Sequence, residues 1–209
     1  MMQTMLEAKK HKLRQDMLHK RKSLCKEQIL LASEKISNEL MHTKEWIEAG
    51  DICLYFPIQN EIDVMQLTKD DWQEKSDTAS PKRFWLPKVL SAKPPYMEFL
   101  PYTEDCNLVE GAYHIMEPDT DDEYLHPKED TLLVLPGSVF GRDGGRIGYG
   151  GGFYDCYMNR YPYCKTIAVC YEFQLLASLP LQEHDRRVHR IIACDLGGEI
   201  LSLYTATKE

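Results

Sequence analysis

The sequence predicts an α/β fold of three layers, α/β/α, around a mainly parallel sheet. Short apolar runs typical of buried strands alternate along the chain with longer segments whose apolar residues recur at helical spacing. Strands that alternate with helices favour parallel pairing, because each helix crosses back over one face of the sheet. We therefore expect one domain, residues 1–209, with a helical pair over about 5–48 and a Rossmann-like sheet core over about 51–195.

Both patterns are present in the first half of the chain. Leu6, Leu13 and Met17 recur at helical spacing among Lys and Arg residues, and an uninterrupted apolar run after Asp51 is typical of a buried strand. In chain order, these patterns predict helices over 5–25 and 27–48, a strand over 52–57, a helix over 63–75, and strands over 84–87 and 97–100.

The second half begins with an acidic stretch, 104–130, which we expect to be irregular because Pro118 and Pro127 interrupt it. Beyond it, apolar runs resume at strand length. They predict strands over 131–135 and 166–170 with a helix over 152–161 between them, and a strand over 190–194 before Gly197-Gly198, which favours a terminal hairpin.

Charge is distributed unevenly over an acidic chain. The net charge of −8 and the pI near 5.4 argue against a general nucleic-acid-binding protein. Residues 9–26 nevertheless carry eight Lys or Arg, and residues 104–130 carry ten Asp or Glu. The simplest interpretation of each stretch is a solvated face.

Seven cysteines, an odd number without a CxxC pair, are typical of reduced thiols in a cytosolic protein. Neither they nor the seven histidines show the spacing of a metal site. No run of about 18 apolar residues is present, and the N-terminus is too polar for a signal peptide. We expect a cytoplasmic monomer that binds neither membrane nor nucleic acid.

The glycine-rich segment 136–155 is the clearest functional signal. Eight of the twelve glycines lie between Gly137 and Gly152, directly after a predicted strand and before a predicted helix. Such a segment, with Arg146 inside it, is suited to wrapping phosphate. A flexible surface loop is the alternative, but five aromatic or aliphatic residues within and beside the glycines favour packing or ring stacking. Neither GxxxxGK[ST] nor GxGxxG is present.

Asp155 is expected in the first turn of the helix that follows. A carboxylate there could complement the helix dipole, or it could bind Mg²⁺ beside phosphates. Three segments fall at the ends of predicted strands: 56–61, 136–155 and 171–174. Because ligand sites in parallel sheets gather at the carboxyl ends of strands, these segments predict one shared site.

The segment 136–155, PGSVFGRDGGRIGYGGGFYD, resembles the signature of the 5-formyltetrahydrofolate cyclo-ligase family, also called methenyltetrahydrofolate synthetases. The resemblance extends over about residues 9–193. Further residues that match the family in order and spacing are Lys10, Leu13, Arg14, Tyr55, Pro57, Glu61, Ile62, Asp63, Glu117, Pro118, Gln174, Leu179, Pro180, His184 and Asp185.

The resemblance implies an ATP- and Mg²⁺-dependent enzyme. Its members cyclise 5-formyltetrahydrofolate, with or without a polyglutamate tail, to 5,10-methenyltetrahydrofolate, and release ADP and phosphate. A formamide oxygen is a poor leaving group, so ATP phosphorylates it before N10 attacks the carbon. A site for this chemistry acts mainly by positioning and charge neutralisation.

Roles for particular residues follow from the same resemblance. Lys10, Arg14 and Arg146 are expected to be catalytic and to contact the ATP phosphates, while Asp155 and Asp185 are expected to bind Mg²⁺. The remaining ATP-binding candidates are Gly148, Tyr149, Gly150, Gly151, Gly152 and Tyr154. The folate-binding candidates are Phe56, Glu61, Tyr149, Gly150, Gly152 and Phe153, for which core packing is the alternative at Phe153.

Two positions depart from the family pattern. Gly151 stands where many members have Lys, and His189 stands where members often have Asp. A folate- or nucleotide-binding protein with little turnover is therefore a second hypothesis. A third is another enzyme on the same scaffold, such as a sugar-phosphate isomerase or a CoA transferase, because fold does not fix function.

Overall fold

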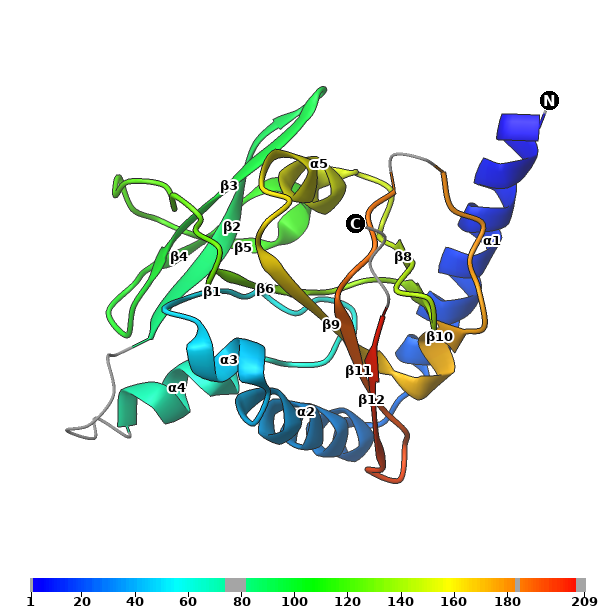
Figure 1. Cartoon of the computed structure of the whole chain (residues 1–209), viewed down its shortest axis with the longest axis horizontal. Coiled ribbons are helices and arrows are strands. Elements are labelled where there is room, and N and C mark those ends of the chain that lie inside the picture. The colour runs from blue at the N-terminus through cyan, green and yellow to red at the C-terminus, as the bar shows by residue number, and fades with distance from the viewer. Residues whose placement is uncertain (1, 74–81, 183–184, 206–209) are drawn as a thin grey trace.

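The computed structural model describes residues 2–73, 82–182 and 185–205. A seven-stranded sheet runs through the molecule in the order β12-β11-β9-β6-β1-β2-β3 (Figure 1). Its strands are β1 (Asp51–Cys53), β2 (Arg83–Ala92), β3 (Pro95–Tyr102), β6 (Leu132–Leu135), β9 (Lys165–Tyr171), β11 (Arg190–Cys194) and β12 (Ile200–Tyr204). The five central strands pair in parallel and the two edge strands pair antiparallel. The predicted α/β fold with a mainly parallel sheet is confirmed.

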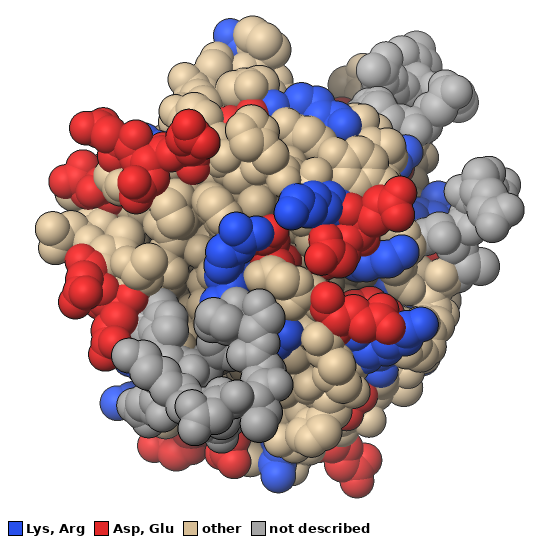
Figure 2. Space-filling model, turned by 60° about the vertical axis from the view of Figure 1, so that its left-hand side comes forward, with Lys and Arg blue, Asp and Glu red and all other residues tan. Residues whose placement is uncertain are grey.

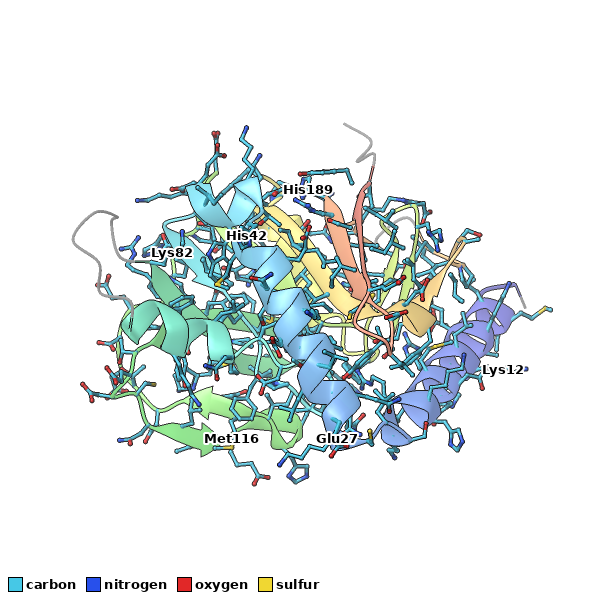
Figure 3. The ribbon with its side chains drawn as sticks, turned by 90° about the horizontal axis from the view of Figure 1, so that it is seen from below. Lys12, Glu27, His42, Lys82, Met116 and His189 are labelled. Carbon is cyan, nitrogen blue, oxygen red and sulfur yellow. The ribbon has the colours of Figure 1, made fainter. Side chains whose placement is uncertain are left out.

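Helices cover both faces of this sheet, which accounts for the uninterrupted apolar runs of the inner strands. On one face lie α2 (Lys26–Met41), α3 (Lys44–Glu48) and α4 (Gln66–Gln73), and on the other lies α5 (Phe153–Arg160) (Figures 1 and 3). Every residue of β6 is buried. Two separate core clusters result, one that includes Ile36 and Leu40 of α2 and one that includes Tyr157 of α5.

The first helix, α1 (Met2–Lys22), does not belong to the two helical layers on the large sheet. It covers a small sheet of β10 (Leu175–Leu176), β7 (Val139–Gly141) and β8 (Arg146–Ile147), through Met17 against Val139 and Ile147. Lys12 points outward from α1 (Figure 3). Because β7 and β8 belong to the glycine-rich segment, this packing fixes α1 beside it.

Several predicted elements differ from the observed ones. The helix predicted over 27–48 is two helices, because Thr43 caps α3 by accepting a hydrogen bond from the Trp46 amide (3.2 Å). The strand predicted over 52–57 ends at Cys53, and the glycine-rich segment contains the β7–β8 pair. Residues 74 and 75 of a predicted helix lie outside the described residues, as does His184.

The acidic stretch 104–130 is more regular than predicted. It contains β4 (Leu108–Glu110), a 3-10 helix (Ala112–His114) and β5 (Met116–Pro118), and β4 and β5 pair as a two-stranded sheet. Glu117 is buried, while the other acidic residues of the stretch are exposed, as expected for a solvated face. Figure 2 shows acidic side chains grouped along one margin of the face it presents, with Lys and Arg among acids elsewhere.

Within the described part of the chain, no helix combines the length and the apolar character needed to cross a bilayer.

Candidate functional site

A cavity of about 870 Å³ lies where β1 and β6 end and α1 approaches the glycine-rich segment. Its wall brings together residues far apart in sequence. They come from α1, from the loop that follows β1, from the strands β2 and β3, from the 3-10 helix and from the start of α5. Every site residue predicted from the sequence lines it: Lys10, Arg14, Phe56, Glu61, Arg146, Gly148, Tyr149, Gly150, Gly151, Gly152, Phe153, Tyr154, Asp155 and Asp185. The structure thus brings the candidates together, and their roles remain predictions.

Glycine is required by backbone conformation at two points of this wall. Gly150 has φ +103° and Gly152, the N-cap of α5, has φ +73°, a region that L side chains rarely adopt. Among the described residues, the backbone N–H groups of 149–152 donate to no protein acceptor. These donors and the positive end of the α5 dipole suit the cavity to an anion.

Three cations face this anion-suited wall. Lys10 and Arg146 are each only 4% exposed, and each is balanced by a carboxylate. Lys10 Nζ lies 2.5 Å from Asp185 Oδ2, and Arg146 Nη2 lies 3.0 Å from Asp155 Oδ2. Arg14 donates from Nε to the carbonyl oxygen of Gly148 (2.8 Å). Burial excludes water from these charges, which strengthens their interaction with any anion that enters.

The carboxylates of Asp155 and Asp185 could supply part of the ligand shell of a magnesium ion. Asp155 lies in the first turn of α5, as predicted, and also accepts a hydrogen bond from the Arg186 amide (3.3 Å). The described residues contain no cluster of three or more His, Cys, Asp or Glu that could hold a metal by itself. Mg²⁺ at phosphates ordinarily takes only one or two carboxylates, with phosphate and water oxygens completing the shell. Two carboxylates beside buried cations meet that requirement.

Glu61 belongs to a second buried charge cluster in the cavity wall. Tyr149 donates its hydroxyl to Glu61 Oε1 (2.6 Å), and the Ile58 amide donates to Glu61 Oε2 (3.0 Å). Behind them, Arg21 donates from Nη2 to the Tyr149 oxygen (2.5 Å), and its Nη1 lies 3.3 Å from Glu61 Oε1. Burial raises the pKa of Glu61, while Arg21, Tyr149 and the Ile58 amide oppose that rise.

Aromatic rings make up much of the remaining wall. The Arg146 guanidinium lies over the ring of Tyr154, 5.5 Å from its centroid, and burial raises the pKa of the Tyr154 hydroxyl, which stays protonated at neutral pH. Phe153 meets Tyr113 edge to face at 5.6 Å between ring centroids. A Cβ at Gly151 would lie 2.6 Å from the Phe153 ring, so a side chain there requires that ring to move.

Some residues of the site were missed from the sequence. The most deeply placed is Arg21, whose position in α1 follows Lys10, Arg14 and Met17 at the spacing of one helical face. That spacing was the available signal. Tyr113, His114 and Ile115, from the acidic stretch, also line the cavity, and their sequence carries no comparable signal.

One expectation about a neighbouring segment is wrong, and the departure from the family pattern at His189 lies away from the cavity. The segment 171–174 does not line the cavity; instead, buried Gln174 donates to the carbonyl oxygens of Gly137 (3.0 Å) and Ser138 (2.9 Å) and so supports the glycine-rich segment from behind. His189 is also outside the cavity wall; its Nδ1 accepts a hydrogen bond from the Thr166 amide (3.2 Å) and lies 2.6 Å from the Thr166 hydroxyl oxygen.

A cavity at the ends of parallel strands, with buried cations beside a helix N-terminus, is a feature shared with the broad class of α/β proteins whose sites suit anionic ligands. The particular family follows from comparison with known proteins. The model of the 5-formyltetrahydrofolate cyclo-ligase family matches residues 6–194. The chain belongs to this family, which confirms the resemblance drawn from the glycine-rich segment and the expectation of an enzyme of this type.

Relatives named 5-formyltetrahydrofolate cyclo-ligase occur in bacteria and animals. The Haemophilus influenzae protein is 27% identical over 157 residues, covering 74% of this chain and 81% of the relative. The Escherichia coli K12 protein is 27% identical over 169 residues (79% and 90%), and the Mus musculus protein is 24% identical over 194 residues (88% and 92%).

Solved structures give the same likeness. The 5,10-methenyltetrahydrofolate synthetase of Aquifex aeolicus superposes with a TM-score of 0.77 at 28% identity, covering 96% of this chain and 94% of that one. The synthetase of Mycoplasma pneumoniae gives a TM-score of 0.64 at 24% identity, over 87% and 96% of the two chains, and shares the fold.

Proposed function

We propose that this protein cyclises 5-formyltetrahydrofolate to 5,10-methenyltetrahydrofolate with ATP and Mg²⁺, releasing ADP and phosphate. One observation carries the proposal: a single cavity combines buried cations at an anion-suited wall with a carboxylate, Glu61, among aromatic rings. The first group suits a triphosphate. The second suits a pterin, whose amino group and ring N–H present two donors to one carboxylate.

In this proposal, the protein acts by holding two substrates in line. Lys10, Arg14 and Arg146 bind the phosphates and neutralise charge while the γ-phosphoryl group passes to the formyl oxygen. The resulting iminium phosphate has an activated carbon and a good leaving group. The folate N10 attacks that carbon, the C–O bond breaks, phosphate leaves with the former formyl oxygen, and N10 loses its proton.

The chain has no need of a covalent nucleophile in this reaction. Asp155 and Asp185 would hold Mg²⁺, which supplies neutralisation of phosphate charge when bound. The buried walls exclude water, which protects the phosphorylated intermediate from hydrolysis. Glu61 and Tyr149 orient the pterin so that the formyl oxygen faces the phosphates.

The test is to mix the purified protein with 5-formyltetrahydrofolate, ATP and Mg²⁺ and to follow the near-ultraviolet absorbance of the methenyl product. We expect an increase that requires both ATP and Mg²⁺, with one ADP formed per product. Binding of 5-formyltetrahydrofolate without product or ADP would contradict the proposal and favour a binding protein. A protein that binds neither substrate would favour another activity on this scaffold.

A further inference from the structure

We propose that Arg21 is a positioning residue that holds the Glu61 carboxylate and the Tyr149 hydroxyl in one fixed, charge-balanced arrangement facing the ligand cavity. Arg21 does not line the cavity and is only 2% exposed. Glu61 and Tyr149 do line it. The proposal deepens the proposed function, since it explains how the folate-facing carboxylate is kept in place.

The geometry forms a closed ring of donors and acceptors. Arg21 donates to the Tyr149 oxygen, Tyr149 donates to Glu61, and the second Arg21 nitrogen lies within ion-pair distance of the same Glu61 oxygen. Removing Arg21 would leave Tyr149 with one fewer partner and Glu61 with no cation. A buried carboxylate without a cation favours its protonated form, which donates a hydrogen bond where the carboxylate accepts one.

The backbone of Arg21 is also held by the loop that carries Glu61. Its backbone carbonyl accepts a hydrogen bond from the Asn60 side chain (2.9 Å), in the loop that carries Glu61. Asn60 has φ 58° and Gln59 has φ 50°, so this loop holds a left-handed conformation, which is uncommon for Gln and is adopted more readily by Asn. The cation therefore ties α1, the loop after β1 and the glycine-rich segment together at one point.

Arg21 is the cation of this cluster, and the other groups around Glu61 are neutral at pH 7. The titratable groups facing it are Arg21 from α1, Tyr149 from the glycine-rich segment, Tyr154 from α5, Tyr55 from the loop after β1 and Tyr171 from β9. Burial raises the pKa of each of these tyrosines, so they stay protonated. Among the described residues that these contacts bring to Glu61, Arg21 is the one that carries a positive charge.

The first experiment needs no ligand. The protonation of Glu61 is followed by carboxyl ¹³C NMR as the pH is varied, with Glu61→Gln to assign the signal. In Arg21→Met, we expect the Glu61 midpoint to rise by about one pH unit or more, because the stabilising cation is lost. An unchanged midpoint in folded Arg21→Met would overturn the proposal.

Arg190→Met is the matched control. Arg190 is another buried arginine, paired with Glu39 (3.5 Å) and Glu45 (3.4 Å) outside the cavity wall. Its loss should lower stability and leave the Glu61 midpoint in place. If Arg21→Met does not fold, Arg21→Met/Glu61→Gln should fold, because no buried charge is left unpaired. A double variant no more stable than Arg21→Met would count against the proposal.

The second experiment measures affinity for 5-formyltetrahydrofolate against pH. Arg21→Met should bind about 10- to 100-fold more weakly at neutral pH, the range for hydrogen bonds to a charged group, and recover as the pH rises. Affinity for ATP should change little, which a general loss of structure would not allow. Absence of folate binding by the unaltered protein would defeat the proposed function, while the ligand-free titration would still decide the role of Arg21.

Discussion

Two kinds of buried charge cluster lie at the cavity: the ion pairs of Lys10 and Arg146, and the cluster around Arg21. They differ in whether a ligand could replace the carboxylate that pairs with each cation. Lys10 and Arg146 pair with Asp185 and Asp155, which themselves line the cavity; the Asp155 side chain is 18% exposed. Arg21 is enclosed and pairs with a Glu61 side chain that is only 4% exposed. We propose that the first pairs exchange their partners for an anion and a metal when ligands bind, whereas the Arg21 cluster keeps its partners.

The largest effect expected on the exchangeable pairs comes from Arg146→Ala. If Arg146 faces the charge that is transferred, turnover should fall by about 10²-fold or more. Arg146→Lys keeps the charge but loses the forked donors, so it should recover only part of the activity. Steady-state and single-turnover kinetics measure both. Full turnover in a folded Arg146→Ala protein would remove this residue from the mechanism.

Lys10 and Lys12 give a sharper contrast, because they are neighbours on one helix. Lys10 is buried in the cavity wall, and Lys12 points outward (Figure 3). Lys10→Met should raise the KM for ATP by about tenfold, the loss of about 1.4 kcal/mol of phosphate binding. Lys12→Met should leave it within about twofold. Equal effects in the two variants would show that α1 acts through its overall charge rather than through Lys10.

Asp155 tests whether the exchange includes a metal. Asp155→Asn should raise the Mg²⁺ concentration needed for half-maximal turnover by about tenfold, because one anionic ligand is lost. Asp143→Asn is the control, since Asp143 pairs with Arg187 at the surface (2.8 Å). The magnesium titration is the measurement. A midpoint that Asp155→Asn leaves unaltered would return Asp155 to the role of a helix-dipole partner.

The difference between the two clusters also explains what the sequence could predict. Uninterrupted apolar runs such as 131–135 predict inner strands well, because a strand buried on both faces needs no polar alternation. The glycine-rich segment can be recognised from the sequence equally well, because its positive φ angles restrict which residues can occupy those positions. Lys10, Arg14 and Arg146 were found because they belong to that pattern or to the family resemblance.

Arg21 could not be identified in the same way. It lies among many Lys and Arg residues of α1, and composition does not show which of them turns inward; its only signal is the spacing that places it on the helical face of Lys10, Arg14 and Met17. Its partners, Glu61 and Tyr149, are brought to it by tertiary packing from segments far away in the chain. The regularity within 104–130 was missed for a related reason: β4 and β5 are three residues each, and their pairing depends on the fold around them.

The smallest effect that we expect is on the pH dependence of stability, and it concerns His189, which lies outside both clusters. Its Nδ1 accepts a hydrogen bond from the Thr166 amide, so the neutral ring fits the fold, and burial lowers the pKa of His189 below its ordinary value of 6.5. The unfolded chain therefore takes up more protons as the pH falls through 6.5. The stability that His189 contributes is present above pH 6.5 and is lost as the pH falls toward the lowered folded-state pKa.

His189→Asn keeps an acceptor and removes the titration. The free energy of unfolding is measured in urea at several pH values. As the pH falls below 6.5, we expect it to fall faster for the unaltered protein than for His189→Asn; above pH 6.5, the two should depend similarly on pH. Turnover at neutral pH should be unchanged, because His189 does not line the cavity. Parallel stability curves across this range would mean that the Thr166 contact survives protonation. A loss of turnover at constant stability would instead connect this position to the cavity, and the division between exchangeable and fixed charges would have to include it.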